Sequence, residues 1–188
     1  MKLILGRAGL TKDEIRSRIL LRLKTHKEES RKRKSKVIKD KLFRTLVFRN
    51  AKHVMFYISF DGEVDTREMI KETKRLGKIV AVPICKAGGI LSPSLLGEKT
   101  KLKKGLYGVY EPAVQRGIDL REIDLVVVPG VAFDTRGNRL GRGEGCYDRF
   151  LKKIPKRTVS VGLAFDFQIL PSLPATTHDV GVKKVLFD

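Results

Sequence analysis

The stretch Asp124-Leu-Val-Val-Val-Pro129 decides the fold, because its run of aliphatic residues predicts a strand that is buried on both faces. Comparable strand patterns lie at residues 53–59, 78–84, 158–164 and 183–187. Helical patterns separate several of these strands, and that order is typical of a parallel sheet covered by helices. The sequence therefore predicts an α/β fold, with an open, mostly parallel sheet, helices on both of its faces and two helices at the N-terminus.

The helical patterns can be placed by their caps and apolar stripes. Thr11 and Glu14 fit a capping box, and the helix that follows has its apolar stripe at Ile15, Ile19, Leu20 and Leu23. A second helix is predicted from about Ser30 to Phe48, with inward side chains at Val37, Ile38, Leu42, Leu46 and Val47. Two more helices are expected over residues 66–76, capped by Asp65 or Thr66, and over residues 147–154.

A hairpin is expected over residues 84–96, turning on Gly88-Gly89.

Length and composition limit the class of protein. With 188 residues and 41% apolar content, the chain can form one domain over residues 1–188. No apolar run approaches the ~18–20 residues of a membrane span, and Met1–Leu10 lack the apolar segment of a secretory signal. The two cysteines, Cys85 and Cys146, form no disulfide framework. We therefore expect a monomeric, cytoplasmic protein with no membrane contact.

The charge is strongly positive. Forty Lys and Arg residues against 21 Asp and Glu residues give a formal net charge of +19. Residues 1–49 hold 17 of the basic and 5 of the acidic residues, so they carry +12 of this charge. Such a field attracts nucleic acids, nucleoside triphosphates and poly-acidic small molecules, and charge alone does not choose between them.

The segment after the Asp124–Pro129 strand carries the strongest chemical signal. Ligands of open parallel sheets bind beyond the carboxyl ends of the strands. Here Gly141, Gly143 and Gly145 alternate, and arginines surround them at positions 136, 139, 142 and 149. Glycines let a ligand approach backbone N–H groups closely, and guanidinium groups match phosphate oxygens. The segment predicts a phosphate site; a strand-to-helix turn with solvated arginines is the simpler alternative.

Two common phosphate-binding patterns are excluded. The sequence Gly-x-x-x-x-Gly-Lys-Ser/Thr is absent, and the dinucleotide pattern Gly-x-Gly-x-x-Gly fails because position 146 is Cys. Asp148 lies just after the glycines, where a carboxylate could hold a Mg²⁺ ion that bridges phosphates.

This segment resembles the signature of the 5-formyltetrahydrofolate cyclo-ligases, also called 5,10-methenyltetrahydrofolate synthetases. The similarity is carried by Val128-Pro-Gly-Val-Ala-Phe-Asp134 and Gly137-Asn-Arg-Leu-Gly-Arg-Gly-Glu-Gly-Cys-Tyr-Asp-Arg-Phe-Leu151. Weaker similarities follow the family's order along nearly the whole chain: Lys12-x-x-x-Arg16, Tyr57-Ile-Ser59 with Glu63-Val-Asp-Thr66, Tyr107-Gly-Val-Tyr-Glu-Pro112, and His178-Asp179.

The resemblance implies an ATP- and Mg²⁺-dependent enzyme that closes 5-formyltetrahydrofolate into 5,10-methenyltetrahydrofolate and releases ADP and phosphate. The γ-phosphoryl group would move to the formyl oxygen, after which N10 attacks and phosphate leaves. This chemistry needs positioning and charge neutralisation rather than a nucleophilic side chain.

The resemblance also assigns residues. Arg142 and Tyr147 would be the catalytic residues, and Ile58, Glu63 and Tyr147 would meet the folate. Asp148 and Asp179 would hold Mg²⁺. The ATP site would comprise Lys12, Arg16, Arg139, Leu140, Gly141, Arg142, Gly143, Glu144, Gly145, Cys146 and Tyr147. From charge alone, the basic surface would also suit a polyglutamylated folate tail.

Two positions depart from the family. Many members have Lys at position 144 and Tyr at position 146, where this chain has Glu144 and Cys146. A carboxylate among phosphates is unfavourable unless its side chain points away. We therefore expect Glu144 to contribute through its backbone, and Cys146 removes a ring that could pack on a ligand.

Two other classes remain to be weighed. A nucleic-acid-binding module would explain the basic N-terminal helices, but few aromatic residues interleave with them, so nucleic acid is not expected as a partner. A phosphosugar or acyl-transfer enzyme would need a catalytic Glu or Lys at a strand end, where only Glu63 is suitable. Lys12 and Arg16, one helical turn apart, could also be a solvated helix face.

Overall fold

A six-stranded sheet forms the centre of the molecule. The computed structural model describes residues 9–188, so most of the Met1–Leu10 segment considered for a signal lies outside the described residues. Within residues 9–188, every pair of neighbouring strands in this sheet is parallel except β2–β3. This confirms the predicted α/β fold. In spatial order the strands are β11 (Lys184–Phe187), β9 (Val159–Ala164), β6 (Leu125–Val128), β1 (His53–Met55), β2 (Ile79–Lys86) and β3 (Ile90–Leu95).

Strand β6 lies near the middle of the sheet and is buried on both faces, as its sequence predicts. All four of its side chains are 0% exposed. Leu125 and Val127 belong to the apolar core that includes the N-terminal helices, and Val126 and Val128 belong to a second core with Phe150. The alternation follows from the two-residue period of a strand. Each face of the sheet therefore has a core of its own.

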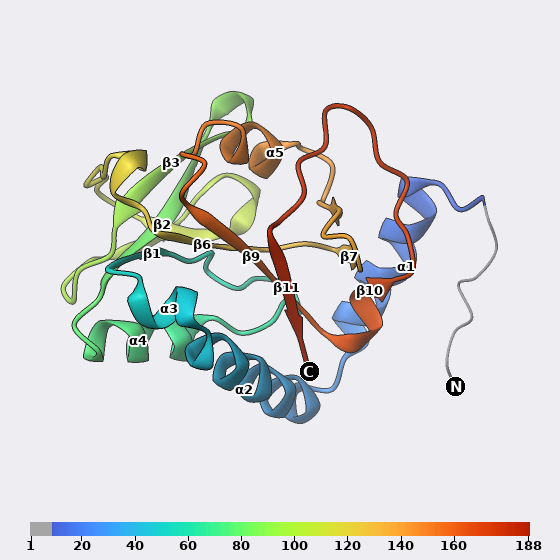
Figure 1. Ribbon diagram of the computed structural model, residues 1–188, viewed down its shortest axis with the longest axis horizontal. Coiled ribbons are helices and arrows are strands. Elements are labelled where there is room, and N and C mark those ends of the chain that lie inside the picture. Colours follow the sequence, from blue (N-terminus) through green and yellow to red (C-terminus); the bar gives the residue numbers. More distant parts are fainter. Residues whose placement is uncertain (1–8) are drawn as a thin grey trace.

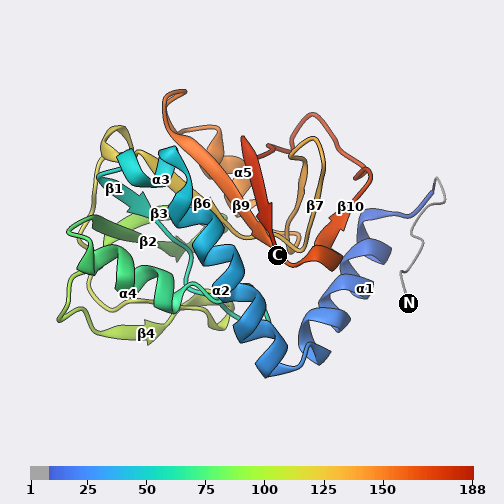
Figure 2. The same cartoon turned by 60° about the horizontal axis from the view of Figure 1, so that its bottom comes forward.

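Helices cover both faces (Figure 1). Helices α2 (Glu28–Arg44), α3 (Leu46–Asn50) and α4 (Arg67–Arg75) lie below the sheet in this view, and α5 (Cys146–Leu151) lies above it. Helix α1 (Lys12–Thr25) diverges from α2 and lies beside β7 and β10 (Figure 2). Thr11 and Glu14 make the predicted capping box of α1. The N-cap of α4 is Thr66, and the Asp65 carboxylate accepts the N–H of Arg67 at 3.0 Å.

The second helix is shorter than its apolar pattern predicts. Thr45 is extended and ends α2, and its hydroxyl accepts the N–H of Phe48 at 3.2 Å, which caps α3. This break turns Leu46 outward, so it is 71% exposed, and Val37 is 38% exposed. Both were expected to face the core. Ile38 and Leu42 are buried as predicted.

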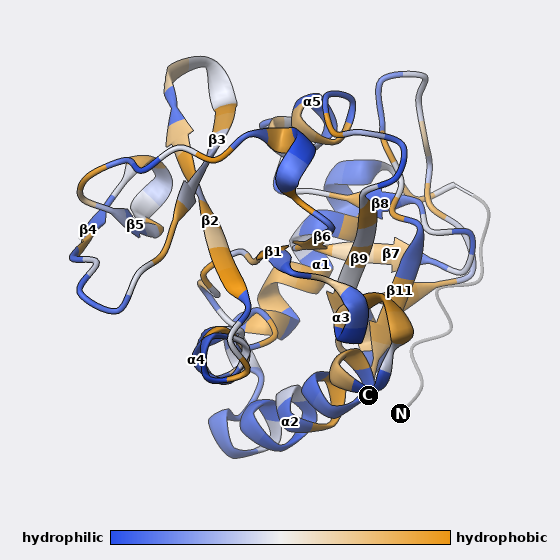
Figure 3. Cartoon of the chain, turned by 60° about the vertical axis from the view of Figure 1, so that its left-hand side comes forward, coloured by the Kyte–Doolittle hydropathy of each residue, from blue (hydrophilic) through white to orange (hydrophobic). Residues whose placement is uncertain are grey.

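Two smaller sheets also lie within residues 9–188. One has the order β10 (Ile169–Leu170), β7 (Ala132–Asp134) and β8 (Arg139–Leu140), and the other pairs β4 (Leu102–Lys104) with β5 (Tyr110–Pro112). Residues 102–112 form an arm that projects beside the β2–β3 hairpin (Figure 3). Short 3₁₀ turns occupy Ala87–Gly89, Leu106–Gly108, Leu120–Glu122 and Asp166–Gln168.

Other boundaries differ by a few residues. The strand predicted over residues 53–59 is paired as a strand only at His53–Met55, and α5 ends at Leu151 rather than at residue 154. The hairpin turns on Gly88-Gly89 as expected. From Gly9 to Asp188, no helix has both the length and the apolar character that crossing a membrane requires.

Candidate active site

A cavity of about 770 Å³ opens where β1, β2 and β6 end. This is the edge at which a parallel sheet presents ligands. Residues from the end of β1, from α1, from the β4–β5 arm and from the segment 139–149 line it. Every residue that the sequence singled out for ATP, folate or metal lies on this cavity. Ile58 and Leu140 contribute buried apolar walls, 7% and 3% exposed.

The glycine loop (Gly141–Gly145) forms one side of the cavity. Asp134 holds the turn that leads into it, because its carboxylate accepts the N–H groups of Arg136 and Asn138, both at 2.9 Å. Gly143 has φ +121° with open space around its missing side chain, and Gly145 has φ +63° as the N-cap of α5. L residues rarely adopt these angles. The local backbone therefore favours glycine, and the space beside Gly143 is open to a ligand.

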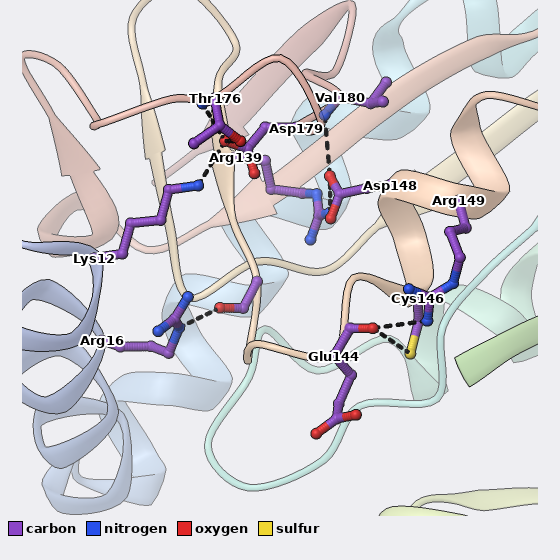
Figure 4. A network of polar contacts seen from close by, with 11 residues as sticks. Lys12, Arg16, Arg139, Glu144, Cys146, Asp148, Arg149, Thr176, Asp179 and Val180 are labelled. Carbon is purple, nitrogen blue, oxygen red and sulfur yellow. Dashed lines mark hydrogen bonds and ion pairs between the residues drawn. The ribbon is translucent and has the colours of Figure 1, made fainter. Parts of the chain in front are cut away.

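Helix α1 reaches the glycine loop through its basic residues (Figure 4). Arg16 Nε donates to the carbonyl oxygen of Gly141 at 2.9 Å. Lys12 Nζ lies 2.5 Å from Asp179 Oδ2, which also accepts the N–H of Thr176. Lys12 and Arg16 are therefore not a solvated helix face, since they join α1 to the cavity wall.

Arg139 is the most deeply buried cation of the site. Its side chain is 4% exposed, and Nη2 lies 2.9 Å from Asp148 Oδ1. Its guanidinium also lies over the Tyr147 ring, 5.7 Å from the centroid. Arg139 Nε and the Tyr147 hydroxyl are buried and have no hydrogen-bond partner among the described residues. Buried polar groups are usually paired, so these two groups are available to a ligand.

Arg142 joins the glycine loop to the loop that follows β1. Its guanidinium lies 3.3 Å from Asp61 Oδ2 and 3.6 Å from Glu63 Oε1. Its Cζ atom lies over the Phe60 ring, 5.3 Å from the centroid. The side chain is 37% exposed. Arg142 thus carries a positive charge between the two predicted subsites.

Glu63 is largely enclosed, with a side chain 14% exposed. It accepts the N–H of Phe60 at 3.0 Å. Burial raises the pKa of Glu63 to about 7, although the Arg142 charge acts in the opposite direction. Burial also raises the pKa of Tyr147, and the nearby Glu63 adds to this effect. Glu63 can therefore change its protonation state near neutral pH.

Asp148 and Asp179 have the donor chemistry of a magnesium site. Each uses one carboxylate oxygen in contacts with this chain: Asp148 Oδ1 with Arg139 and the Val180 N–H, and Asp179 Oδ2 with Lys12 and Thr176. The other oxygen of each accepts no hydrogen bond from residues 9–188. Burial opposes ionisation of Asp179, but hydrogen bonds from Lys12 and Thr176 lower its pKa overall. Mg²⁺ commonly binds one or two carboxylates together with substrate phosphates, so these residues fit.

The two departures from the family pattern have clear positions. The Glu144 carboxylate accepts the Tyr107 hydroxyl at 3.3 Å, so it points toward the β4–β5 arm (Figure 4 shows it turned away from Arg139 and Asp148). Cys146 lies beside Cys85 at the edge of the cavity. Burial and the neighbouring Cys146 thiol raise the pKa of Cys85 to about 11.

Sequence reasoning gave no role to several residues of the site. Asp61 and Phe60 contact Arg142, and Tyr107 contacts Glu144. Tyr107 has φ +64°, which is uncommon for a non-glycine residue. The motif at residues 107–112 pointed to this segment without indicating that it forms an arm over the cavity.

An α/β sheet whose strand ends meet a glycine loop, a buried arginine and two part-buried carboxylates is typical of an enzyme that acts on a phosphate-bearing substrate. The chain belongs to the 5-formyltetrahydrofolate cyclo-ligase family, whose model matches residues 8–188. Members of this family are ATP-dependent ligases of folate one-carbon metabolism. The resemblance read from the motifs is confirmed.

Relatives and solved structures agree with this assignment. A mouse 5-formyltetrahydrofolate cyclo-ligase is 29% identical over 93% of this chain and 92% of its own length. The Haemophilus influenzae enzyme of that name is 36% identical over 73% of this chain and 76% of its own length. The NMR structure of Aquifex aeolicus 5,10-methenyltetrahydrofolate synthetase is 31% identical, with a TM-score of 0.83 over 95% of this chain and 90% of that chain. A Mycoplasma pneumoniae synthetase, 20% identical, shares the fold with a TM-score of 0.78, over 94% of this chain and 98% of that chain.

Proposed function

We propose that this 5-formyltetrahydrofolate cyclo-ligase forms 5,10-methenyltetrahydrofolate by moving the γ-phosphoryl group of ATP to the formyl oxygen of its substrate, within the cavity described above. The activity follows from family membership. The chemical route and the residue roles are the proposal. The residue roles are supported by one observation: all the candidate residues, from distant parts of the chain, line one cavity.

The route explains why the cavity holds charged positioning groups. A formamide oxygen is a poor leaving group, and its phosphorylation converts it into a good one. N10 then attacks the activated carbon and loses its proton to water, the C–O bond breaks, and phosphate leaves. Phosphoryl transfer depends on positioning and on neutralising the phosphate charge. The arginines supply both without a nucleophilic side chain.

In this proposal the glycine loop and its cations form the ATP subsite. The open amides around Gly143 face the phosphates, and Arg142 neutralises charge that develops during transfer. Lys12 and Arg16 contribute from α1, and the buried Arg139 holds the base of the site. Leu140, Gly141, Gly145, Cys146 and Tyr147 shape the remaining wall, and Glu144 contributes its backbone.

The folate subsite is proposed in the loop that follows β1. The Glu63 carboxylate can accept two parallel hydrogen bonds from the N–H groups of a pterin ring. Such donors favour the ionised form, so folate binding should lower the pKa of Glu63 from its value near 7. Ile58 gives an apolar wall. The Tyr147 hydroxyl, which has no hydrogen-bond partner among residues 9–188, is proposed to lie between the two subsites.

Mg²⁺ is proposed to bind Asp148 and Asp179 together with the ATP phosphates. The ion would supply positive charge to the phosphates. Asp148 and Asp179 would present their free carboxylate oxygens to it, while Arg139 and Lys12 hold the other oxygens in place.

The formal charge of +19 supports a polyglutamylated form of the folate as substrate, because extra carboxylates would meet a basic surface. We also propose that the enzyme acts as a monomer. A cytoplasmic location belongs to the same proposal.

The test is a direct assay. Purified protein with Mg²⁺, ATP and 5-formyltetrahydrofolate should accumulate the methenyl product, followed by its near-ultraviolet absorbance, and omission of ATP should stop the reaction. Absence of product at neutral and slightly acid pH, while a known cyclo-ligase works in parallel, would contradict the proposed function.

A further inference from the structure

The Gly88-Gly89 turn of the β2–β3 hairpin does more than reverse the chain. The Nη2 atom of Arg149, on α5, donates to the carbonyl oxygens of Gly88 at 3.0 Å and Gly89 at 3.1 Å. The same atom donates to the carbonyl oxygen of Glu144, in the glycine loop, at 2.7 Å. One guanidinium group therefore joins the hairpin turn to the glycine loop.

Glycine packs closely on both sides of this guanidinium. A Cβ atom added to Gly89 would overlap Arg149 Nη2, and Gly89 also has φ +67°. A Cβ atom at Gly145 would lie 3.0 Å from Arg149 Nη1, and Gly145 has φ +63°. Gly88, with φ +72°, has open space around it. Gly89 and Gly145 thus form a socket for the Arg149 side chain.

From this geometry we infer that Arg149 is a positioning residue of the phosphate subsite. This inference rests on the proposed function, in which the amides of Glu144 and Gly145 face the nucleotide. Arg149 fixes this backbone by fastening it to the β2–β3 hairpin. Its Nη2 atom already has three carbonyl partners, so it is not free to hold a phosphate oxygen. Arg142 differs because it contacts carboxylates at the centre of the cavity.

The inference predicts a selective kinetic defect. Arg149→Ala should lower kcat/KM for ATP by about 10- to 100-fold, because a shift of the loop by about 1 Å misplaces the phosphates. The KM for 5-formyltetrahydrofolate should change by no more than about two-fold, because the proposed folate groups lie in the loop that follows β1. Lys153→Ala, an exposed lysine two residues beyond the end of α5, is the matched control and should behave as wild type.

Chemical rescue separates positioning from general stability. Guanidinium ion added at millimolar concentration should restore part of the Arg149→Ala activity, and equal concentrations of NaCl or methylammonium should not. Arg149→Lys should recover activity only in part, since an ammonium group lacks the planar donor array of guanidinium. The inference would be overturned if kcat/KM fell equally for ATP and for 5-formyltetrahydrofolate and guanidinium gave no rescue. Kinetics like those of Lys153→Ala would overturn it as well.

Hydrogen exchange in the protein without ligands keeps this test independent of catalysis. Arg149→Ala and Gly89→Ala should each speed exchange of the amides in residues 143–149, while Lys153→Ala should not. If wild type lacks ATP-dependent cyclisation but Arg149→Ala still loosens the loop, the proposed function fails and the fastening by Arg149 stands. If exchange of these amides is unchanged in both variants, the positioning role is wrong.

Discussion

Arg139 and Asp148 form a largely buried ion pair beneath the glycine loop, with 2.9 Å between Nη2 and Oδ1 and side chains 4% and 19% exposed. The same carboxylate oxygen accepts the N–H of Val180 at 3.0 Å. Asp148 therefore fixes Arg139 and joins α5 to the segment before β11. Its second oxygen accepts no hydrogen bond from the part of the chain that the structure describes.

Asp148→Asn should shift the magnesium dependence of the reaction to several-fold higher concentration, because one anionic ligand is lost. It should also lower the free energy of unfolding by about 1–3 kcal/mol, because Arg139 keeps its charge without its partner. The measurements are a Mg²⁺ titration of activity and urea unfolding. Asp119→Asn, in an exposed ion pair with Arg121, is the control for the titration. A Mg²⁺ titration that matches wild type would remove Asp148 from the proposed metal site.

Arg142→Ala should lower kcat by about 10²- to 10³-fold, because its charge would no longer stabilise the transferring phosphoryl group. Steady-state kinetics with both substrates measure this effect. Arg136→Ala is the matched control, since Arg136 is 69% exposed and does not line the cavity. Turnover of Arg142→Ala within a few-fold of that control would count against the assignment of Arg142.

Glu63 should make stability depend on pH. Its pKa rises from 4.5 to about 7 on folding, so between these values the folded chain keeps a proton that the unfolded chain releases. The free energy of unfolding should therefore fall as pH rises from about 5 to about 8, by up to about 3 kcal/mol from this group. Urea unfolding of wild type and Glu63→Gln across this range isolates the contribution, because other titrating groups cancel. Parallel pH profiles for the two proteins would show that Glu63 keeps an ordinary pKa.

Gly62 should tolerate no side chain. It has φ +84°, and an added Cβ atom would overlap the carbonyl oxygen of Leu23 on α1. Gly77 has a similar φ of +74° but open space around it. Thermal unfolding should show Gly77→Ala destabilised by about 1 kcal/mol from backbone strain alone, and Gly62→Ala by clearly more, because α1 must also move. Equal melting temperatures for the two variants would mean that α1 does not press on the loop after β1.

The parts of the fold that the sequence predicted are those with strong local patterns. The Leu125–Val128 run indicated a strand buried on both faces, and Thr11 with Glu14 indicated the start of α1. The glycine and arginine pattern identified the segment that lines the cavity. Because ligands of parallel sheets bind beyond the carboxyl ends of the strands, the segment after Pro129 was also predicted at that edge, and it lines the cavity there.

The parts of the fold and of the site that the sequence did not predict depend on contacts between distant residues. Strands of two or three residues, such as β8 and β10, carry too few positions to show a period. Thr45 breaks the second helix although the apolar spacing continues to Val47. The socket for Arg149 joins positions 89 and 145, and no spacing along the chain could reveal it.

The most direct measurement is a crystal structure with Mg²⁺ and a non-hydrolysable ATP analogue. We predict phosphate oxygens within hydrogen-bonding distance of the amides of Gly143 to Gly145 and of the Arg142 guanidinium, with the terminal phosphate facing the proposed folate subsite. A triphosphate bound at any other surface, with the glycine loop free of it, would contradict the account.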